Sequence, residues 1–185
     1  LLSGIVSFSA LLLLLSYQAL AWIYSAPPLR LKQYPGIATL LASFAGILVL
    51  VAGYVSVAPT HNITALPLSL LAFLFLSYTL ALPIKDFKDV AGDKRDGVYT
   101  VPVLFGIKRA QYIMGSLLFL LFALSPIILH MRSLFPGAIV IGSLAFFSLQ
   151  KGTSDEASFF AFRKLPRIIL SLVILYGITV LLSLL

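Results

Sequence analysis

The sequence predicts an all-α, polytopic membrane helix bundle, and three observations lead to this fold class. Of its 185 residues, 61% are hydrophobic and only 10% are charged, and the mean hydropathy is +1.09. Several apolar stretches approach the roughly 20 residues that a helix needs to cross a bilayer. These stretches do not alternate between polar and apolar residues as the strands of a membrane barrel do. Because backbone groups cannot stay unpaired in lipid, we expect helices that form a single transmembrane domain over residues 1–185.

About six transmembrane helices are predicted, and each has its own sequence signal. The first ends in the interfacial aromatic residues Trp22 and Tyr24. The second is dotted with small residues, which let helices pack closely in lipid. The third runs directly into an acidic stretch, the fourth follows Lys108 and Arg109, the fifth is short, and the last begins at Arg167. The spans cover residues 3–23, 36–58, 66–84, 110–130, 134–149 and 167–185.

The positive charge is distributed asymmetrically between the loops. The loops at 24–35, 85–109 and 150–166, together with Arg167, hold 12 of the 13 Lys and Arg residues, and only Arg132 lies on the opposite side. The positive-inside rule therefore places these three loops in the cytoplasm. The net charge of +7 is explained by this topology, so we predict the lipid bilayer and no nucleic acid as a partner. The absence of cysteine excludes disulfides and thiol catalysis.

Four of the six acidic residues are concentrated within 11 residues, at Asp86, Asp89, Asp93 and Asp96. At about 100° per residue, a helix would place all four within roughly 80° of one another, with Lys88 and Arg95 on the other side. Hard oxygen ligands at this spacing suit Mg²⁺. The alternative interpretation is a solvated segment whose Asp and Lys side chains pair with each other.

The loop at residues 24–36 has the sequence YSAPPLRLKQYPG. Its adjacent prolines, Pro27 and Pro28, stop a helix. They place Arg30 and Lys32 at the membrane surface, where the two cations either bind a diphosphate or only satisfy the positive-inside rule.

Together the two motifs resemble those of the UbiA superfamily of intramembrane prenyltransferases. The second aspartate motif of that family reads D-x-x-D-x-x-x-D, followed by a Gly, a Ser or Thr, and a Pro. The basic loop of the family has its counterpart in YSAPPLRLK, in the double-proline form of chlorophyll synthase-like, homogentisate or naphthoate-type members. The matching positions of the aspartate motif are Asp86, Asp89, Asp93, Gly97, Thr100 and Pro102.

The resemblance implies a nine-helix bundle, of which this chain would supply helices 4–9. Such proteins transfer an isoprenyl group from an isoprenyl diphosphate to an aromatic or other lipophilic acceptor, with Mg²⁺ as cofactor and release of diphosphate. By matching position, Asp86, Asp89 and Asp93 are the metal ligands. Tyr24, Arg30 and Lys32 are the catalytic candidates, and the diphosphate-binding candidates are Arg30, Lys32, Lys85 and Lys94.

The family's first aspartate motif, similar to N-D-x-x-D, has no counterpart in this sequence. We therefore expect an N-terminal segment or a partner chain to carry it, and we do not expect the 185-residue chain to catalyse alone.

Two alternatives remain at this point. A CDP-alcohol phosphatidyltransferase-like enzyme would use D-x-x-D-G-x-x-A-R, but Thr100 and Val101 stand where this pattern needs Ala and Arg. A non-catalytic membrane subunit or a cation transporter is the other alternative. Transporters place ionisable residues near the bilayer midplane, and the predicted spans have none there.

Overall fold

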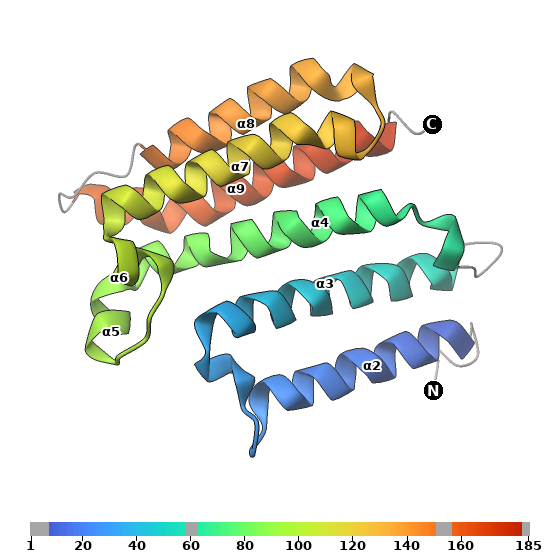
Figure 1. Cartoon of the computed structure of the whole chain (residues 1–185), viewed down its shortest axis with the longest axis horizontal. Helices are drawn as coiled ribbons and strands as arrows, with labels where there is room; N and C mark the ends of the chain where they lie inside the picture. Colours follow the sequence, from blue (N-terminus) through green and yellow to red (C-terminus); the bar gives the residue numbers. More distant parts are fainter. Residues whose placement is uncertain (1–7, 58–62, 151–156, 183–185) are drawn as a thin grey trace. The chain divides into compact units, whose positions relative to one another are not determined.

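The computed structural model describes residues 8–57, 63–150 and 157–182, and every regular element in these ranges is a helix (Figure 1). This confirms the all-α fold class. The chain divides into two compact units, Leu1–Thr79 and Leu80–Leu185.

The first unit contains α2 (Phe8–Ser25), α3 (Pro35–Val57) and most of α4 (Leu68–Ala81), with short 3₁₀ helices η1 (Leu31–Gln33) and η2 (Ile63–Ala65) between them. Helices α2 and α3 pack against each other along their length. The buried centre consists of Ala10 on α2 and of Ile47, Val51 and Val55 on α3. Side chains of α4 close this centre: Leu71, Leu74, Phe75 and Tyr78.

The second unit begins with the short helices η3 (Leu82–Lys88), α5 (Val90–Arg95) and α6 (Val101–Phe105). The long helices α7 (Ile107–Ile128), α8 (Phe135–Gln150) and α9 (Ala157–Leu182) follow, with η4 (Arg132–Leu134) between α7 and α8. Helices α7 and α8 approach closely because small residues lie between them: Gly115 faces Phe146, and Gly142 faces Phe119 and Phe122. The hydroxyl groups of Ser125 on α7 and Tyr176 on α9 are hydrogen-bonded to each other.

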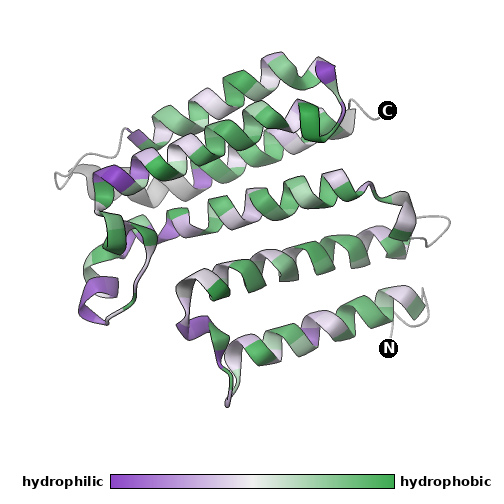
Figure 2. Cartoon of the chain, in the orientation of Figure 1, coloured by the Kyte–Doolittle hydropathy of each residue, from purple (hydrophilic) through white to green (hydrophobic). Residues whose placement is uncertain are grey.

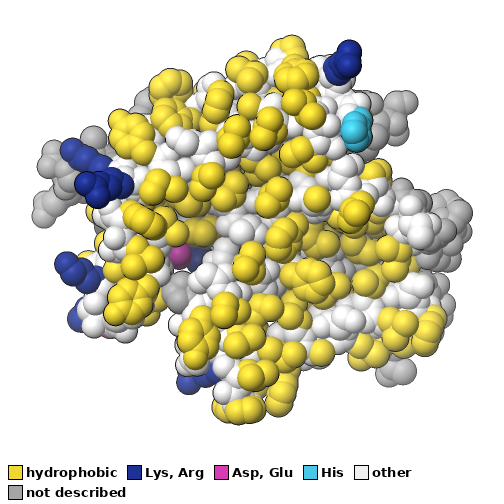
Figure 3. Space-filling model, viewed as in Figure 1, with side chains coloured by type: hydrophobic (Ala, Val, Ile, Leu, Met, Phe, Trp, Pro, Cys, Tyr) yellow, Lys and Arg dark blue, Asp and Glu magenta, His cyan; other side chains and the backbone are white. Residues whose placement is uncertain are grey.

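Within the part of the chain that the structure describes, five helical segments are long and apolar enough to cross a membrane, which confirms the polytopic architecture. Only 6% of the α2 span and 44% of the α7 span are buried within the protein. Many large hydrophobic side chains are therefore exposed, as the face drawn in Figure 3 shows, while hydrophilic residues gather mainly at helix ends (Figure 2). The five segments are Phe8–Ser25, Gly36–Val57, Leu68–Lys88, Ile107–Ile128 and Arg132–Gln150.

The sixth predicted span differs from the structure at its start. Helix α9 begins at Ala157, ten residues before the predicted position 167. The segment ASFFAFRK is rich in residues that a helix tolerates well, so the helix extends into the predicted loop. The apolar part of α9, Arg167–Val180, is shorter than the other five. Residues 3–7 of the first predicted span and 183–185 of the last lie outside the described residues.

Gly142 holds α7 and α8 at their short separation. A Cβ atom at this position would lie 3.2 Å from Cβ of Phe122 and 3.3 Å from the carbonyl oxygen of Phe119. The backbone oxygen cannot move without moving α7. A larger residue would therefore push the two helices apart.

We expect Gly142→Ala to destabilise the protein relative to Gly137→Ala by about 1–3 kcal/mol, the usual cost of overpacking. Gly137 lies on the same helix, and a Cβ atom there would meet nothing within 4 Å. Thermal unfolding in detergent measures both variants. Equal stabilities would contradict the role assigned to Gly142.

Candidate functional site

The aspartate segment is not one continuous α-helix, so the prediction that one regular helix carries its four aspartates is wrong. Asp86 lies in the 3₁₀ helix η3, Asp89 is the junction residue with φ −110° and ψ 9°, and Asp93 lies in α5. Asp and Gly favour helix ends over helix interiors, and adjacent carboxylates repel. These preferences explain why the helix breaks within this segment.

Gly97 ends α5 and turns the chain back on itself. Its φ of +69° is left-handed, a conformation that glycine adopts without a steric cost. The N–H of Gly97 donates to the carbonyl of Lys94, and the N–H of Val98 donates to the carbonyl of Asp93. This pair of bonds is a Schellman motif. The reversed chain then brings Thr100, the residue that precedes α6, back to the aspartates.

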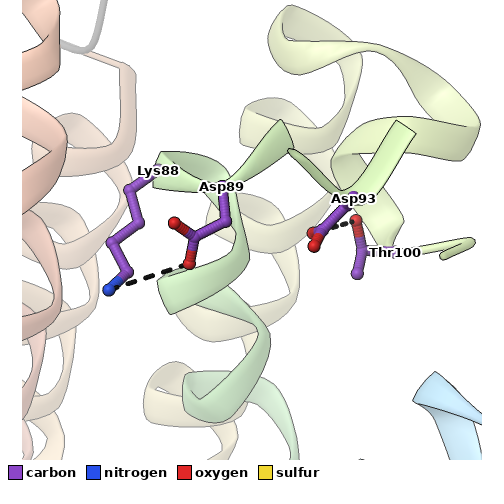
Figure 4. A network of polar contacts seen from close by, with 4 residues as sticks. All are labelled: Lys88, Asp89, Asp93 and Thr100. Carbon is purple, nitrogen blue, oxygen red and sulfur yellow. Dashed lines mark hydrogen bonds and ion pairs between the residues drawn. The ribbon is translucent and has the colours of Figure 1, made fainter. Parts of the chain in front are cut away.

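The carboxylates of Asp89 and Asp93 have different side-chain partners (Figure 4). Asp93 accepts a hydrogen bond of 3.2 Å on Oδ2 from the hydroxyl of Thr100, a side chain that is only 6% exposed. The Nζ atom of Lys88 lies 3.7 Å from Oδ2 of Asp89. Nε of Arg95 lies 3.3 Å from Oδ1 of Asp96. The expectation that Lys88 and Arg95 point away from the acids is therefore wrong.

The two ion pairs leave the carboxylates accessible. Lys88 and Asp89 are about half exposed, and Arg95 and Asp96 are more exposed still. Exposed pairs of this kind stabilise a protein by about 0–1 kcal/mol. Asp89 can therefore exchange Lys88 for another cation at little cost.

Asp86 is half-buried at the start of the segment. The carboxylates of Asp89 and Asp93 lie close enough to repel it, and the ammonium groups of Lys85 and Lys88 lie close enough to attract it. Among the described residues, no group of three or more His, Cys, Asp or Glu side chains gathers in the geometry of a metal site. The segment therefore does not present three carboxylates arranged together around one metal position.

The basic loop of the first unit connects α2 to α3. Tyr24 is the penultimate residue of α2 and is partly buried, and Lys32 is exposed within η1. Arg30 is exposed and has left-handed backbone angles, φ 40° and ψ 52°. A non-glycine residue in this conformation is strained, and such strain is concentrated at functional sites.

Comparison with known proteins identifies the family. The model of the UbiA prenyltransferase family matches residues 1–165. The chain belongs to the UbiA prenyltransferase family. The resemblance that the two motifs suggested is therefore confirmed, and together with the apolar helices it makes the chain an integral membrane protein.

Individual UbiA-type relatives match shorter segments. The chain is 43% identical over 44 residues to digeranylgeranylglyceryl phosphate synthase of Methanococcoides burtonii, a segment that covers 24% of this chain and 16% of that protein. It is 36% identical over 96 residues to the chloroplastic chlorophyll synthase of Oryza sativa subsp. japonica and 37% identical over 101 residues to that of Arabidopsis thaliana. Each of these two matches covers 51% of this chain and 24% of the relative. No solved structure matches.

Sequence reasoning missed two contacts of the UbiA aspartate segment. The Thr100–Asp93 hydrogen bond depends on the chain reversal at Gly97. The glycine in the sequence could have predicted this reversal. The Lys88–Asp89 ion pair depends on the helix junction at Asp89, which the regular spacing of the aspartates concealed.

Gly97→Ala should loosen the end of α5 by about 1–2 kcal/mol, because an alanine is strained at left-handed φ. Gly92 is the matched control, because it is helical, and a Cβ atom there meets nothing within 4 Å. Amide hydrogen exchange of Val98 should accelerate in Gly97→Ala and stay equal or slow in Gly92→Ala. Unchanged exchange in Gly97→Ala would refute the Schellman closure.

Proposed function

We propose that this chain supplies part of the active site of a membrane prenyltransferase. The reaction transfers an isoprenyl group from an isoprenyl diphosphate to a lipophilic acceptor, depends on Mg²⁺ and releases diphosphate. The family match over residues 1–165 carries this proposal. The aspartate segment at the end of the apolar span Leu68–Lys88 supports it, because a lipid-soluble substrate with a charged head would meet polar groups there.

The donor atoms of the segment fit Mg²⁺. This ion usually takes one or two protein carboxylates and completes its shell with water and substrate phosphates, so a cluster of three acids is not required. Asp86, Asp89 and Asp93 are the proposed ligands, of which one or two would bind the ion, and the bound metal would neutralise the diphosphate and favour its departure. Among the described residues, Thr100 bonds to one oxygen of Asp93, and the carboxylate of Asp89 pairs with an exposed lysine.

The basic side chains provide the complementary binding groups. Arg30, Lys32, Lys85 and Lys94 are exposed, and we assign to them the binding of diphosphate oxygens by charge-assisted hydrogen bonds. The hydroxyl of Tyr24 is assigned to the same diphosphate. In the reaction the allylic C–O bond breaks and its electron pair leaves with the diphosphate. A carbon or oxygen of the acceptor forms the new bond and loses its proton.

The names of the relatives support a broad class of acceptor and not one compound. One is named for digeranylgeranylglyceryl phosphate and two for chlorophyll, which supports an aromatic or other lipophilic acceptor. We further propose that residues 1–185 form one transmembrane domain with the aspartate segment on the cytoplasmic side. An N-terminal segment or a partner chain would carry the first aspartate motif.

The central test is the Mg²⁺-dependent stabilisation of the chain by geranylgeranyl diphosphate in detergent. At 100 times its dissociation constant, a ligand stabilises the folded state by about 2.7 kcal/mol. We expect Asp89→Asn to abolish this stabilisation. Asp96→Asn should retain it, because Asp96 pairs with Arg95 and is not among the proposed ligands.

Three outcomes would contradict the proposal. Stabilisation by a CDP-alcohol instead would favour a phosphatidyl-group transferase. Stabilisation by neither compound would favour a non-catalytic subunit or a transporter. Equal effects of Asp89→Asn and Asp96→Asn would remove Asp89 from the metal site.

Thr100→Val should raise the Mg²⁺ concentration at half-maximal stabilisation about tenfold, because removal of a hydrogen bond to a metal ligand typically weakens metal binding by this order. Thr100→Ser keeps the hydroxyl and should restore the affinity. If valine and serine behave alike, the Thr100–Asp93 bond does not orient a ligand.

A further inference from the structure

A second polar feature lies at the end of α7 that is remote from the aspartate segment. It is a pocket of about 390 Å³ lined by Pro126, Ile127, His130, Arg132 and Phe135. Helix α7 has 22 residues, so its two ends are about 33 Å apart, close to the thickness of the hydrocarbon core. Because α7 is long and apolar enough to cross a membrane, the pocket would lie at the surface opposite to the aspartate segment. Its volume falls in the range of small-molecule sites, about 300–1,000 Å³.

The backbone holds His130 at this pocket in a strained conformation. The N–H of His130 donates to the carbonyl of Ile127, and the N–H of Met131 donates to that of Pro126. This is the same Schellman closure that ends α5, but the left-handed residue is His130, with φ 57°, and not a glycine. Because glycine would occupy this position without strain, an imidazole here suggests a function for the side chain.

The side chains of His130 and Arg132 are exposed at this pocket. Among the described residues, ion pairs link Lys88 to Asp89 and Arg95 to Asp96, and neither His130 nor Arg132 has an ion pair or a side-chain hydrogen bond. Figure 3 shows a basic side chain and a histidine close together at the upper right edge of the molecule. A guanidinium group matches phosphate oxygens with two parallel donors, and an imidazole adds a further N–H.

Exposed apolar side chains follow the pocket along α7 and α8. Ile127 and Phe135 line it and are 58% and 39% exposed. Leu124 and Leu120, three and seven residues before Ile127, are also exposed and lie on the same face of α7. Ile139 is exposed one turn after Phe135 on α8. A ligand with a charged head and long apolar chains would fit both parts.

We propose that this pocket binds the phosphate of a membrane phospholipid whose acyl chains lie along the exposed faces of α7 and α8. The exposed apolar side chains favour a lipid over free phosphate. The sequence gives a separate reason: Arg132 is the only basic residue on its side of the predicted topology. The positive-inside rule does not account for a cation at this position. The proposal does not depend on prenyl transfer.

Native mass spectrometry of the delipidated chain with phosphatidylglycerol tests the proposal. We expect Arg132→Gln to weaken binding about tenfold, the effect of losing one charge-assisted contact. Lys108→Gln removes the same charge from the other end of α7, where Lys108 is exposed, and should leave the affinity unchanged. Dioleoylglycerol, which lacks the phosphate, should bind at least about tenfold more weakly than phosphatidylglycerol.

His130→Gly separates binding from folding. Glycine suits the left-handed position, so the thermal stability should be retained or raised, while phosphatidylglycerol binding should fall about threefold for the loss of one neutral hydrogen bond. The proposal fails if Lys108→Gln weakens binding as much as Arg132→Gln, or if dioleoylglycerol binds equally well. It also fails if inorganic phosphate at millimolar concentration displaces the lipid, because the site would then be one for a free anion.

Discussion

The structure depends on the need to satisfy every backbone N–H and C=O group within the membrane. Helices meet this need along their length but leave groups unpaired at each end. Polar chemistry is therefore confined to the helix ends, where the chain can combine side chains with freed backbone groups. The aspartate segment between α4 and α7 and the His130–Arg132 pocket between α7 and α8 both occupy such ends.

Close packing of α7 and α8 links these two ends. Gly142 meets Phe119 and Phe122, and Gly115 meets Phe146, so the helices touch through small residues along their interface. In lipid, where apolar contact between helices gains little from excluding water, such close approach supplies most of the attraction. The packed helices therefore keep the aspartate segment and the His130–Arg132 pocket about one membrane thickness apart.

The sequence predicted the fold class and the long helices because these follow from composition and segment length. The ends of α7 and α8 lie within three residues of the predicted spans 110–130 and 134–149. The aspartate segment was harder to predict. The predicted helical face required the same rotation about the helix axis at every residue. The helix is interrupted at Asp89, and Lys88 lies beside the carboxylate of Asp89. The Thr100–Asp93 bond joins residues seven positions apart across a left-handed turn, which no helical or strand periodicity describes.

Asp93 and Asp89 differ in how firmly the fold holds them. The backbone carbonyl of Asp93 accepts the N–H of Val98, and its carboxylate accepts the hydroxyl of the nearly buried Thr100. Asp89 has an exposed lysine as its side-chain partner. The pair thus combines an anchored carboxylate with an adjustable one. In the proposed metal site, Asp93 would therefore supply a ligand of fixed position, and Asp89 would supply one that can rotate without a change in the backbone.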